Sequence, residues 1–330
     1  MTQRVGWIDN LRAVACLMVI MIHTTAWYVT QGVKAGGHVW EIANLLNSAS
    51  RVCVPLFFMI SGYLFFGQRG AGRRHLIRIV CCLLFYSMVA LAYISWLTPI
   101  SERLALENLL QKPVFYHLWF FFALLVVYLL SPLIEVRPAH ARYLFLIALI
   151  LGVAANPNTV SVSLGPVQWL PLNLYIGGDT FYYLLYALLG RALGDLTIMY
   201  RGYGWLAGGI FILCVMGIAL GTKHQSTVNG AFADTWYVYC GPLVFIAACC
   251  LFLCVRTVLP DALPGLALIS RYSLPVYGFH ALFIHFLRTQ HFDYIQRPWL
   301  DIPWVFITTL LASLLLAAGL KKIDKYHLVS

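Results

Sequence analysis

The stretch IDNLRAVACLMVIMIH, residues 8–23, places three ionisable residues in a run that is otherwise apolar. Such runs recur along all 330 residues: 61% of the chain is hydrophobic and 10% is charged, whereas soluble domains carry about 25% charged residues. Runs of about 20 apolar residues suit helices that cross a membrane. The sequence therefore predicts an all-α polytopic membrane protein that forms one domain over residues 1–330, without a separate soluble domain.

Ten membrane-spanning helices are predicted, with both termini in the cytoplasm. Their orientation follows from Lys and Arg, which favour cytoplasmic loops. The loops assigned to that side hold more than twice as many of these residues as the opposite loops. The predicted spans are 7–31, 41–66, 76–97, 114–134, 142–155, 179–195, 203–221, 236–259, 269–289 and 302–320.

Two connections between the spans have unusual compositions. Residues 101–113 are polar on one helical face and leucine-rich on the other, which is typical of a short helix at the membrane surface. Residues 156–178 carry no charge and are rich in Pro, Gly and Asn. We expect an ordered loop there and consider it a candidate lid.

The net charge of +10 does not indicate nucleic-acid binding, because the basic residues are spread over short loops. The nine cysteines lie in or beside apolar runs, and no Cys-x-x-Cys pair occurs. We interpret them as packing residues and expect no metal site.

The first predicted helix carries its ionisable residues on one face. Asp9 and Arg12 are three residues apart and therefore neighbours on a helix. Arg12 and His23 are eleven apart, so they share a face about 16 Å apart along the axis. Ionisable residues in membrane helices often mark functional sites, and this face predicts a polar path. A structural ion pair plus a buried histidine hydrogen bond is the alternative interpretation.

Four motifs resemble those of the membrane-bound acyltransferase 3 family, and their order along the chain agrees with that family. The first is Arg, ten residues and His, here Arg12 and His23. VPLFFMISGYLF (54–65) is similar to its Phe-Phe-x-x-Ser-Gly segment, and RRHLIRI (73–79) to its arginine-rich cytoplasmic loop. VYGFHALFI (276–284) is similar to its late Tyr-x-x-His helix.

Segments such as WIDNLR (7–12) and MIHTTAWYVT (21–30) are closer still to one glycan O-acetyltransferase of this family. That closer resemblance implies acetyl transfer from acetyl-CoA to a hydroxyl of a cell-surface glycan, on N-acetylglucosamine, at the bacterial inner membrane. Acetyl-CoA would be a substrate, and no tightly bound cofactor is expected. The acceptor would be a lipid-linked or polymeric glycan, and membrane lipids would be the other partners. Direct attack by the sugar and an acetyl-histidine intermediate both stay open.

The candidate site residues fall into three groups. His23, as general base, Arg12 and Asp9 are the catalytic candidates. Arginine suits phosphate groups, so Arg12, Arg73, Arg74 and Arg78 are candidates for holding the coenzyme. Ser61, in the second motif, is a further candidate. The candidates for the acceptor pocket are Arg51, His117, Asp179, Asp234, Asn47 and Trp27, with His280 in support.

Some of these candidates have structural alternatives. Asp179 and Asp234 stand at predicted helix starts, where carboxylates also serve as caps. Trp27 also fits an interfacial aromatic belt. Arg73 and Arg74 also fit the positive side of a topology signal.

Two other classes of function stay open. One is a transporter or flippase for a glycan intermediate, although such proteins are often built from internal repeats and none is visible here. The other is a non-catalytic partner of a polysaccharide assembly complex. Transfer of labelled acetyl groups would separate both from an enzyme.

Overall fold

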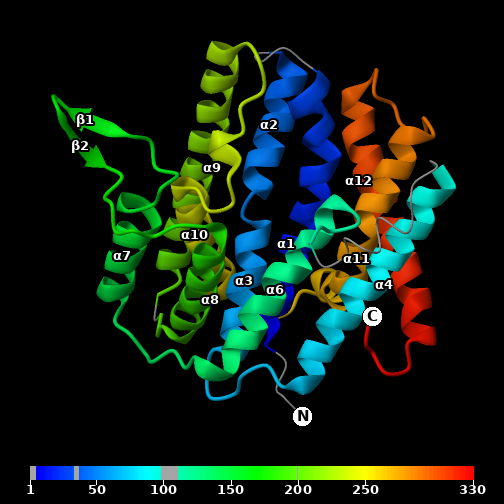
Figure 1. Cartoon of the computed structure of the whole chain (residues 1–330), viewed down its shortest axis with the longest axis horizontal. Coiled ribbons are helices and arrows are strands. Elements are labelled where there is room, and N and C mark those ends of the chain that lie inside the picture. The colour runs from blue at the N-terminus through cyan, green and yellow to red at the C-terminus, as the bar shows by residue number, and fades with distance from the viewer. Residues whose placement is uncertain (1–4, 33–36, 98–110, 199) are drawn as a thin grey trace. The chain divides into compact units, whose positions relative to one another are not determined.

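The computed structural model describes residues 5–32, 37–97, 111–198 and 200–330. These residues are mostly helical, which agrees with the all-α prediction (Figure 1). The chain divides into two compact units. Unit 1 contains Met1–Gln68 and Glu135–Ser270, and unit 2 contains Arg69–Ile134 and Arg271–Ser330.

Unit 1 is a helical bundle with one small hairpin. Its elements are α1 (Gly6–Trp27) with the π-helical turn η1 (Tyr28–Gly32), α2 (His38–Ser50), α3 (Cys53–Phe65), α7 (Ala141–Leu149) with the π-helical turn η4 (Ile150–Ala154), β1 (Val162–Leu164), β2 (Val167–Leu170), α8 (Asp179–Asp195), α9 (Gly202–Asn229), the 3-10 turn η5 (Thr235–Tyr237) and α10 (Pro242–Val258). The start of α11 (Pro264–Thr289) also belongs to it. In Figure 1, α9 runs beside α10, and these two helices pack together.

Glycine allows α3 and α8 to pack with their backbones in contact. A Cβ atom on Gly62 would lie 1.8 Å from the carbonyl oxygen of Ala187, and one on Gly190 would lie 2.1 Å from that of Met59. No side chain can occupy those positions without moving a helix. The glycine of the Ser-Gly-Tyr motif therefore has a packing role.

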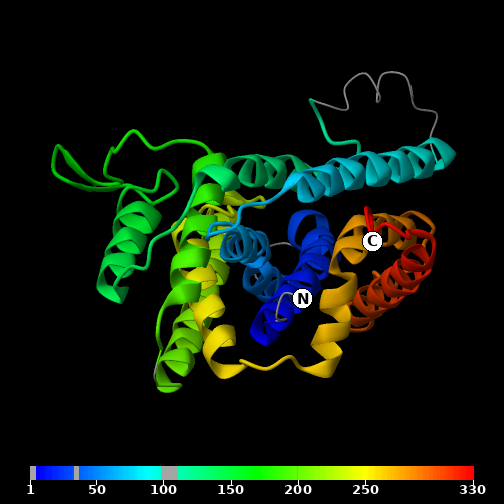
Figure 2. The ribbon, with the colours of Figure 1, turned by 90° about the horizontal axis from the view of Figure 1, so that it is seen from below.

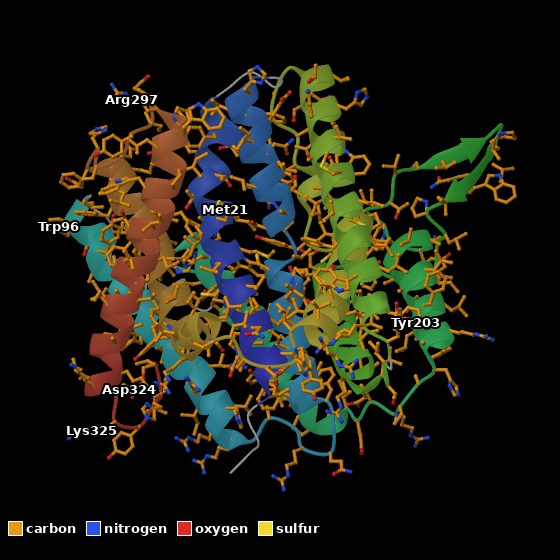
Figure 3. The ribbon with its side chains drawn as sticks, turned by 180° about the vertical axis from the view of Figure 1, so that it is seen from behind. Met21, Trp96, Tyr203, Arg297, Asp324 and Lys325 are labelled. Carbon is orange, nitrogen blue, oxygen red and sulfur yellow. The ribbon has the colours of Figure 1, made fainter. Side chains whose placement is uncertain are left out.

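Unit 2 consists of α4 (Arg73–Leu97), the 3-10 turn η2 (Tyr116–Leu118), α6 (Trp119–Leu130), the 3-10 turn η3 (Ser131–Leu133), the remainder of α11 and α12 (Pro298–Ile323). The aromatic ring of Tyr86 stacks on Phe121 with ring centroids 6.1 Å apart and meets Phe279 edge-on at 5.4 Å. These rings join α4, α6 and α11. Figure 3 shows Arg297 and Asp324 at opposite ends of α12.

A tail segment, residues 324–330, folds back after α12. The Asp324 carboxylate accepts hydrogen bonds from the backbone N–H groups of Leu328, Val329 and Ser330 at 2.8–3.1 Å. The tail then lies along α4, where the Tyr86 hydroxyl donates to the Val329 carbonyl at 2.7 Å.

Each of the ten predicted spans coincides with helical structure. Within the described ranges, seven helical segments are long and apolar enough to cross a membrane: 6–30, 38–65, 73–97, 116–133, 202–229, 235–258 and 298–323. The helix over Ala141–Ala154 is apolar but shorter. The chain is therefore described as a helical membrane protein, while the count of ten spans and the cytoplasmic termini stay predictions.

The two unusual connections have different outcomes. Most of the predicted surface helix at 101–113 lies outside the described residues. The predicted loop at 156–178 contains an antiparallel hairpin in which Val162 pairs with Leu170 and Leu164 with Val167. Figure 2 shows this hairpin extending away from α7. All of its apolar side chains except that of Leu170 are exposed, and Trp169 is 58% exposed.

The cysteines agree with the packing interpretation. All nine are free thiols, and all are buried or partly buried. No metal-binding cluster of three His, Cys, Asp or Glu residues occurs in the described part of the chain.

Candidate functional site

A polar cluster in unit 1 surrounds the start of α1. Arg12 Nη1 lies 3.6 Å from Asp9 Oδ1, as the i, i+3 spacing predicts. The Ser270 hydroxyl donates to the same Asp9 oxygen at 2.7 Å and lies 3.4 Å from Arg12 Nη1. The Asp9 side chain is 7% exposed and the Arg12 side chain 28%. The buried carboxylate therefore orients a guanidinium that a ligand can still reach.

Asn10 fixes the position of this cluster. Its side-chain amide donates to the carbonyl oxygens of Leu259 and Asp261 at 3.1 and 2.7 Å, and its Oδ1 accepts from the Leu263 N–H at 2.9 Å. These bonds join the start of α1 to the connection between α10 and α11. Sequence reasoning missed both Asn10 and Ser270, because their partners lie about 250 residues away.

A second cluster in unit 1 adjoins His23. The Asn47 amide donates to the Ile22 carbonyl at 3.0 Å and to Thr25 Oγ1 at 2.9 Å, so α2 is bonded to the turn of α1 that carries His23. Asn47 Oδ1 accepts hydrogen bonds from Arg51 Nε and Nη2 at 2.9 and 2.5 Å. Asn47 is fully buried, whereas His23 is partly exposed. One buried amide thus holds a cation beside the helical turn of the candidate base.

The Arg51 guanidinium is held by neutral groups. Its central carbon lies 4.1 Å from the ring centroid of Tyr237 and 5.8 Å from that of Tyr239, and Nη1 lies 3.4 Å from the Tyr237 carbonyl oxygen. In the described residues no carboxylate forms an ion pair with it. A partly buried cation without a counter-ion can stabilise an anion or a developing oxyanion. The two tyrosines were not predicted, because a loop distant in sequence supplies them.

The other acceptor candidates of unit 1 are more exposed. Asp179 and Asp234 are both exposed, and neither makes a capping hydrogen bond. Asp234 directly precedes the η5 turn, which opens the helical segment 235–258, as predicted, while α10 itself begins at Pro242. Trp27 is 37% exposed and meets the Tyr28 ring edge-on. Among the described contacts, none joins these three residues to Arg51.

The coenzyme candidates occupy both units. On α3 of unit 1, Ser61 is buried. At the start of α4 in unit 2, Arg73 and Arg74 are exposed, while Arg78 is partly buried. Arg78 Nη2 donates to the carbonyl of Ser330 in the tail segment at 2.7 Å. The expected arginine cluster therefore exists on one helix, but the tail engages two of its members, because Arg74 Nη2 also lies 3.4 Å from the Tyr326 carbonyl.

Unit 2 holds a buried pair of imidazoles. His117 in η2 and His280 in α11 have ring centroids 5.1 Å apart and are 2% and 0% exposed. His117 Nε2 lies 3.1 Å from the Gly278 carbonyl, and His280 Nδ1 lies 2.6 Å from the Tyr277 carbonyl. The Tyr277 hydroxyl in turn donates to the His117 carbonyl. The late Tyr-x-x-His motif thus contacts His117 through both of its defining residues.

Unit 2 also contains a buried ion network that sequence reasoning missed. Arg288 near the end of α11 bonds Asp293 at 2.9 Å and Asp301 at 2.7 Å. The Asp301 side chain is 0% exposed and also accepts the Tyr294 N–H at 2.8 Å. This network fixes the connection between α11 and α12.

Comparison with known proteins gives one family. Residues 5–318 match the sequence model of a family described as an acyltransferase domain. A serine/alanine racemase of Enterococcus gallinarum is 26% identical over 198 residues, which are 54% of this chain and 23% of that protein. The match spans less than a quarter of that relative, so its activity does not transfer to this chain. No solved structure matches.

Proposed function

Because the chain belongs to the acyltransferase 3 family, we propose that it moves an acetyl group from acetyl-CoA to a hydroxyl of a cell-surface glycan. The observation that supports this proposal is the presence of two polar clusters along α1. One contains Asp9 and Arg12, and the other lies at the turn of His23, where Asn47 holds Arg51. Apolar membrane helices surround polar groups of this kind chiefly where they serve a reaction or a path.

The proposed donor side uses arginines. Arg12, oriented by Asp9, and the exposed Arg73 and Arg74 bind the phosphates of acetyl-CoA, since guanidinium groups stay charged and donate several hydrogen bonds. The coenzyme would arrive from the cytoplasm, in keeping with the proposed cytoplasmic termini. Ser61 and Arg78 complete the set proposed for the donor.

The proposed chemistry is one acyl transfer. His23 takes the proton of the sugar hydroxyl while that oxygen attacks the carbonyl carbon of the thioester. The carbon–sulfur bond breaks, and coenzyme A leaves as the thiol with that proton. Arg51 stabilises the oxyanion between the two steps. An acetyl-His23 intermediate remains a second route, in which the ring nitrogen attacks first.

The acceptor proposal is more specific than the family. Segments such as NLLNSASRVCVPLFFMISGYLFFG resemble the enterobacterial common antigen O-acetyltransferase, and we propose that N-acetylglucosamine residues of this antigen accept the acetyl group in the inner membrane. In unit 1, Asn47, Arg51, Trp27, Asp179 and Asp234 are proposed to contact the acceptor. In unit 2, His117 contacts it with His280 in support.

The test uses purified protein, labelled acetyl-CoA and a lipid-linked glycan. Acetylated glycan is expected with the native chain. His23→Ala should lower transfer by about 10²- to 10⁴-fold, the contribution of a general base. His224→Ala is the matched control, because His224 is an exposed histidine on α9. Equal transfer by both variants would remove His23 from the mechanism.

A second pair of variants tests the donor site. Arg73→Gln with Arg74→Gln should raise the KM for acetyl-CoA more than it lowers kcat, whereas Arg137→Gln, at another exposed arginine, should change neither. Glycan movement across vesicles without consumption of acetyl-CoA would favour the transporter instead.

A further inference from the structure

The His117 imidazole has one ring nitrogen that nothing in the described part of the chain satisfies. Its Nδ1 is buried and has no hydrogen-bond partner there. The ring as a whole is 2% exposed. Buried polar atoms nearly always have a partner, so this nitrogen indicates a missing ligand group or water.

The chemical state of the ring follows from its other nitrogen. His117 Nε2 faces the Gly278 carbonyl oxygen at 3.1 Å, and a carbonyl only accepts, so Nε2 carries the hydrogen. In the neutral ring Nδ1 is then a lone-pair acceptor. By the same reasoning the Tyr277 carbonyl fixes the hydrogen of His280 on Nδ1, which makes His280 Nε2 an acceptor as well. Neither ring can donate through those two nitrogens, so His117 Nδ1 requires a donor from outside the pair.

The surroundings limit the kind of donor. Rings of Phe115, Tyr116 and Tyr277 lie within 5.5–5.8 Å of the His117 ring, and the fourth neighbour is His280. No carboxylate contributes to this cluster in the described residues, so nothing there favours a cationic donor. The apolar faces of these rings suit the C–H face of a sugar. Tyr116 is 50% exposed, so the cluster reaches the surface of unit 2.

We propose that His117 Nδ1 accepts a hydrogen bond from a neutral hydroxyl of the sugar acceptor and thereby determines which sugar binds. This inference rests on the proposed function and names one contact in it. His117 is a binding residue here, and the proton transfer stays with His23.

Two amide substitutions separate this role from a structural one. In His117→Gln the amide nitrogen can replace Nε2 and keep the bond to the Gly278 carbonyl, while no atom replaces Nδ1. In His117→Asn the amide oxygen can replace Nδ1, while the bond to Gly278 is lost. A sugar-binding role predicts that Gln weakens acceptor binding and Asn retains it at lower thermal stability. A purely structural role predicts that Gln retains acceptor binding and that Asn weakens it.

The probe is a short-chain alkyl glycoside of N-acetylglucosamine, together with its mono-deoxy analogues. Binding is measured by calorimetry without acetyl-CoA, and the KM and kcat for the glycoside are measured with it. His117→Gln should raise the dissociation constant and the KM by about tenfold, the size of one lost hydrogen bond to a neutral group. It should leave the KM for acetyl-CoA unchanged. The native chain should bind one deoxy analogue more weakly than the complete glycoside, and His117→Gln should bind the two equally.

Each outcome decides a different question. Unchanged glycoside binding in folded His117→Gln would overturn the inference, as would a fall in kcat alone. Native protein that binds the glycoside but transfers no acetyl group would refute the proposed function and leave the His117 contact standing. If His117→Gln does not fold, the structural role has prevailed and the proposal fails.

Discussion

Replacing Asp301 with alanine is expected to lower the free energy of unfolding by about 3 kcal/mol. Asp301 Oδ2 lies 2.7 Å from Arg288 Nη2, and the exposed fractions of the two side chains are 0% and 14%. Removing one partner of a buried ion pair costs about 3–5 kcal/mol, because a charge remains without compensation. Arg288 keeps Asp293 at 2.9 Å, so the lower end of that range applies.

The measurement is equilibrium unfolding in mixed detergent micelles with an increasing fraction of SDS. The fluorescence of the ten tryptophans reports unfolding of the whole chain, and one of them, Trp304, donates its indole N–H to the Phe292 carbonyl in the same connection at 3.0 Å. Asp195→Ala is the matched control. Its pair with Arg191 has a similar length of 2.9 Å, but both side chains are about a quarter exposed, and such pairs contribute at most about 1 kcal/mol.

The reasoning fails if Asp301→Ala and Asp195→Ala cost the same. A double variant supplies a second check. In an Arg288→Met background, Asp301→Ala should lower the free energy of unfolding by clearly less than it does alone. The reason is that no Arg288 guanidinium is then left buried without its partner.

Two further predictions concern packing and the tail segment. Gly62→Ala should destabilise the protein by about 3 kcal/mol, since the new Cβ would meet the Ala187 carbonyl. Gly209→Ala, where the new Cβ has nothing within 4 Å, should instead stabilise it by up to about 1 kcal/mol, and SDS unfolding measures both. Burial raises the pKa of Asp324, but the N–H groups of the tail outweigh burial and lower that pKa below its ordinary value. The tail is therefore held at pH above about 4 and released as pH falls through the lowered pKa. Protection of the amides of 328–330 from hydrogen exchange, measured relative to their intrinsic rates at each pH, should fall in acid, and in Asp324→Asn at neutral pH. Protection independent of both changes would show that Asp324 does not hold the tail.

The features that sequence predicted are those set by local geometry. The Asp9–Arg12 pair follows from a helical period, and the helices follow from runs of apolar residues. Partners from distant segments were beyond reach: nothing in the sequence places Ser270 against Asp9 or Asn47 against the Ile22 carbonyl. Such contacts depend on which helices pack together and in what register.

The hairpin and the histidine pair show two other limits. Residues 160–164 (VSVSL) alternate apolar and polar residues as a strand does, a signal that sequence reasoning missed, although both faces of β1 are exposed. His117 was predicted to contact an acceptor, but which nitrogen is available depends on a carbonyl of α11. The position of the Gly278 carbonyl oxygen beside His117 is known only from the structure.

The two units alternate along the chain, and this order affects synthesis of the protein. Residues 69–134 of unit 2 leave the ribosome roughly 140 residues before the segment 271–330 that completes the unit. At about 5–20 residues per second, the helix after His117 waits on the order of 10 s for its partner at Gly278. During translation the incomplete bundle of unit 2 therefore contains the His117 imidazole before its carbonyl partner on α11 has been made. We expect the insertion machinery or neighbouring lipids to contact this ring until α11 has been inserted.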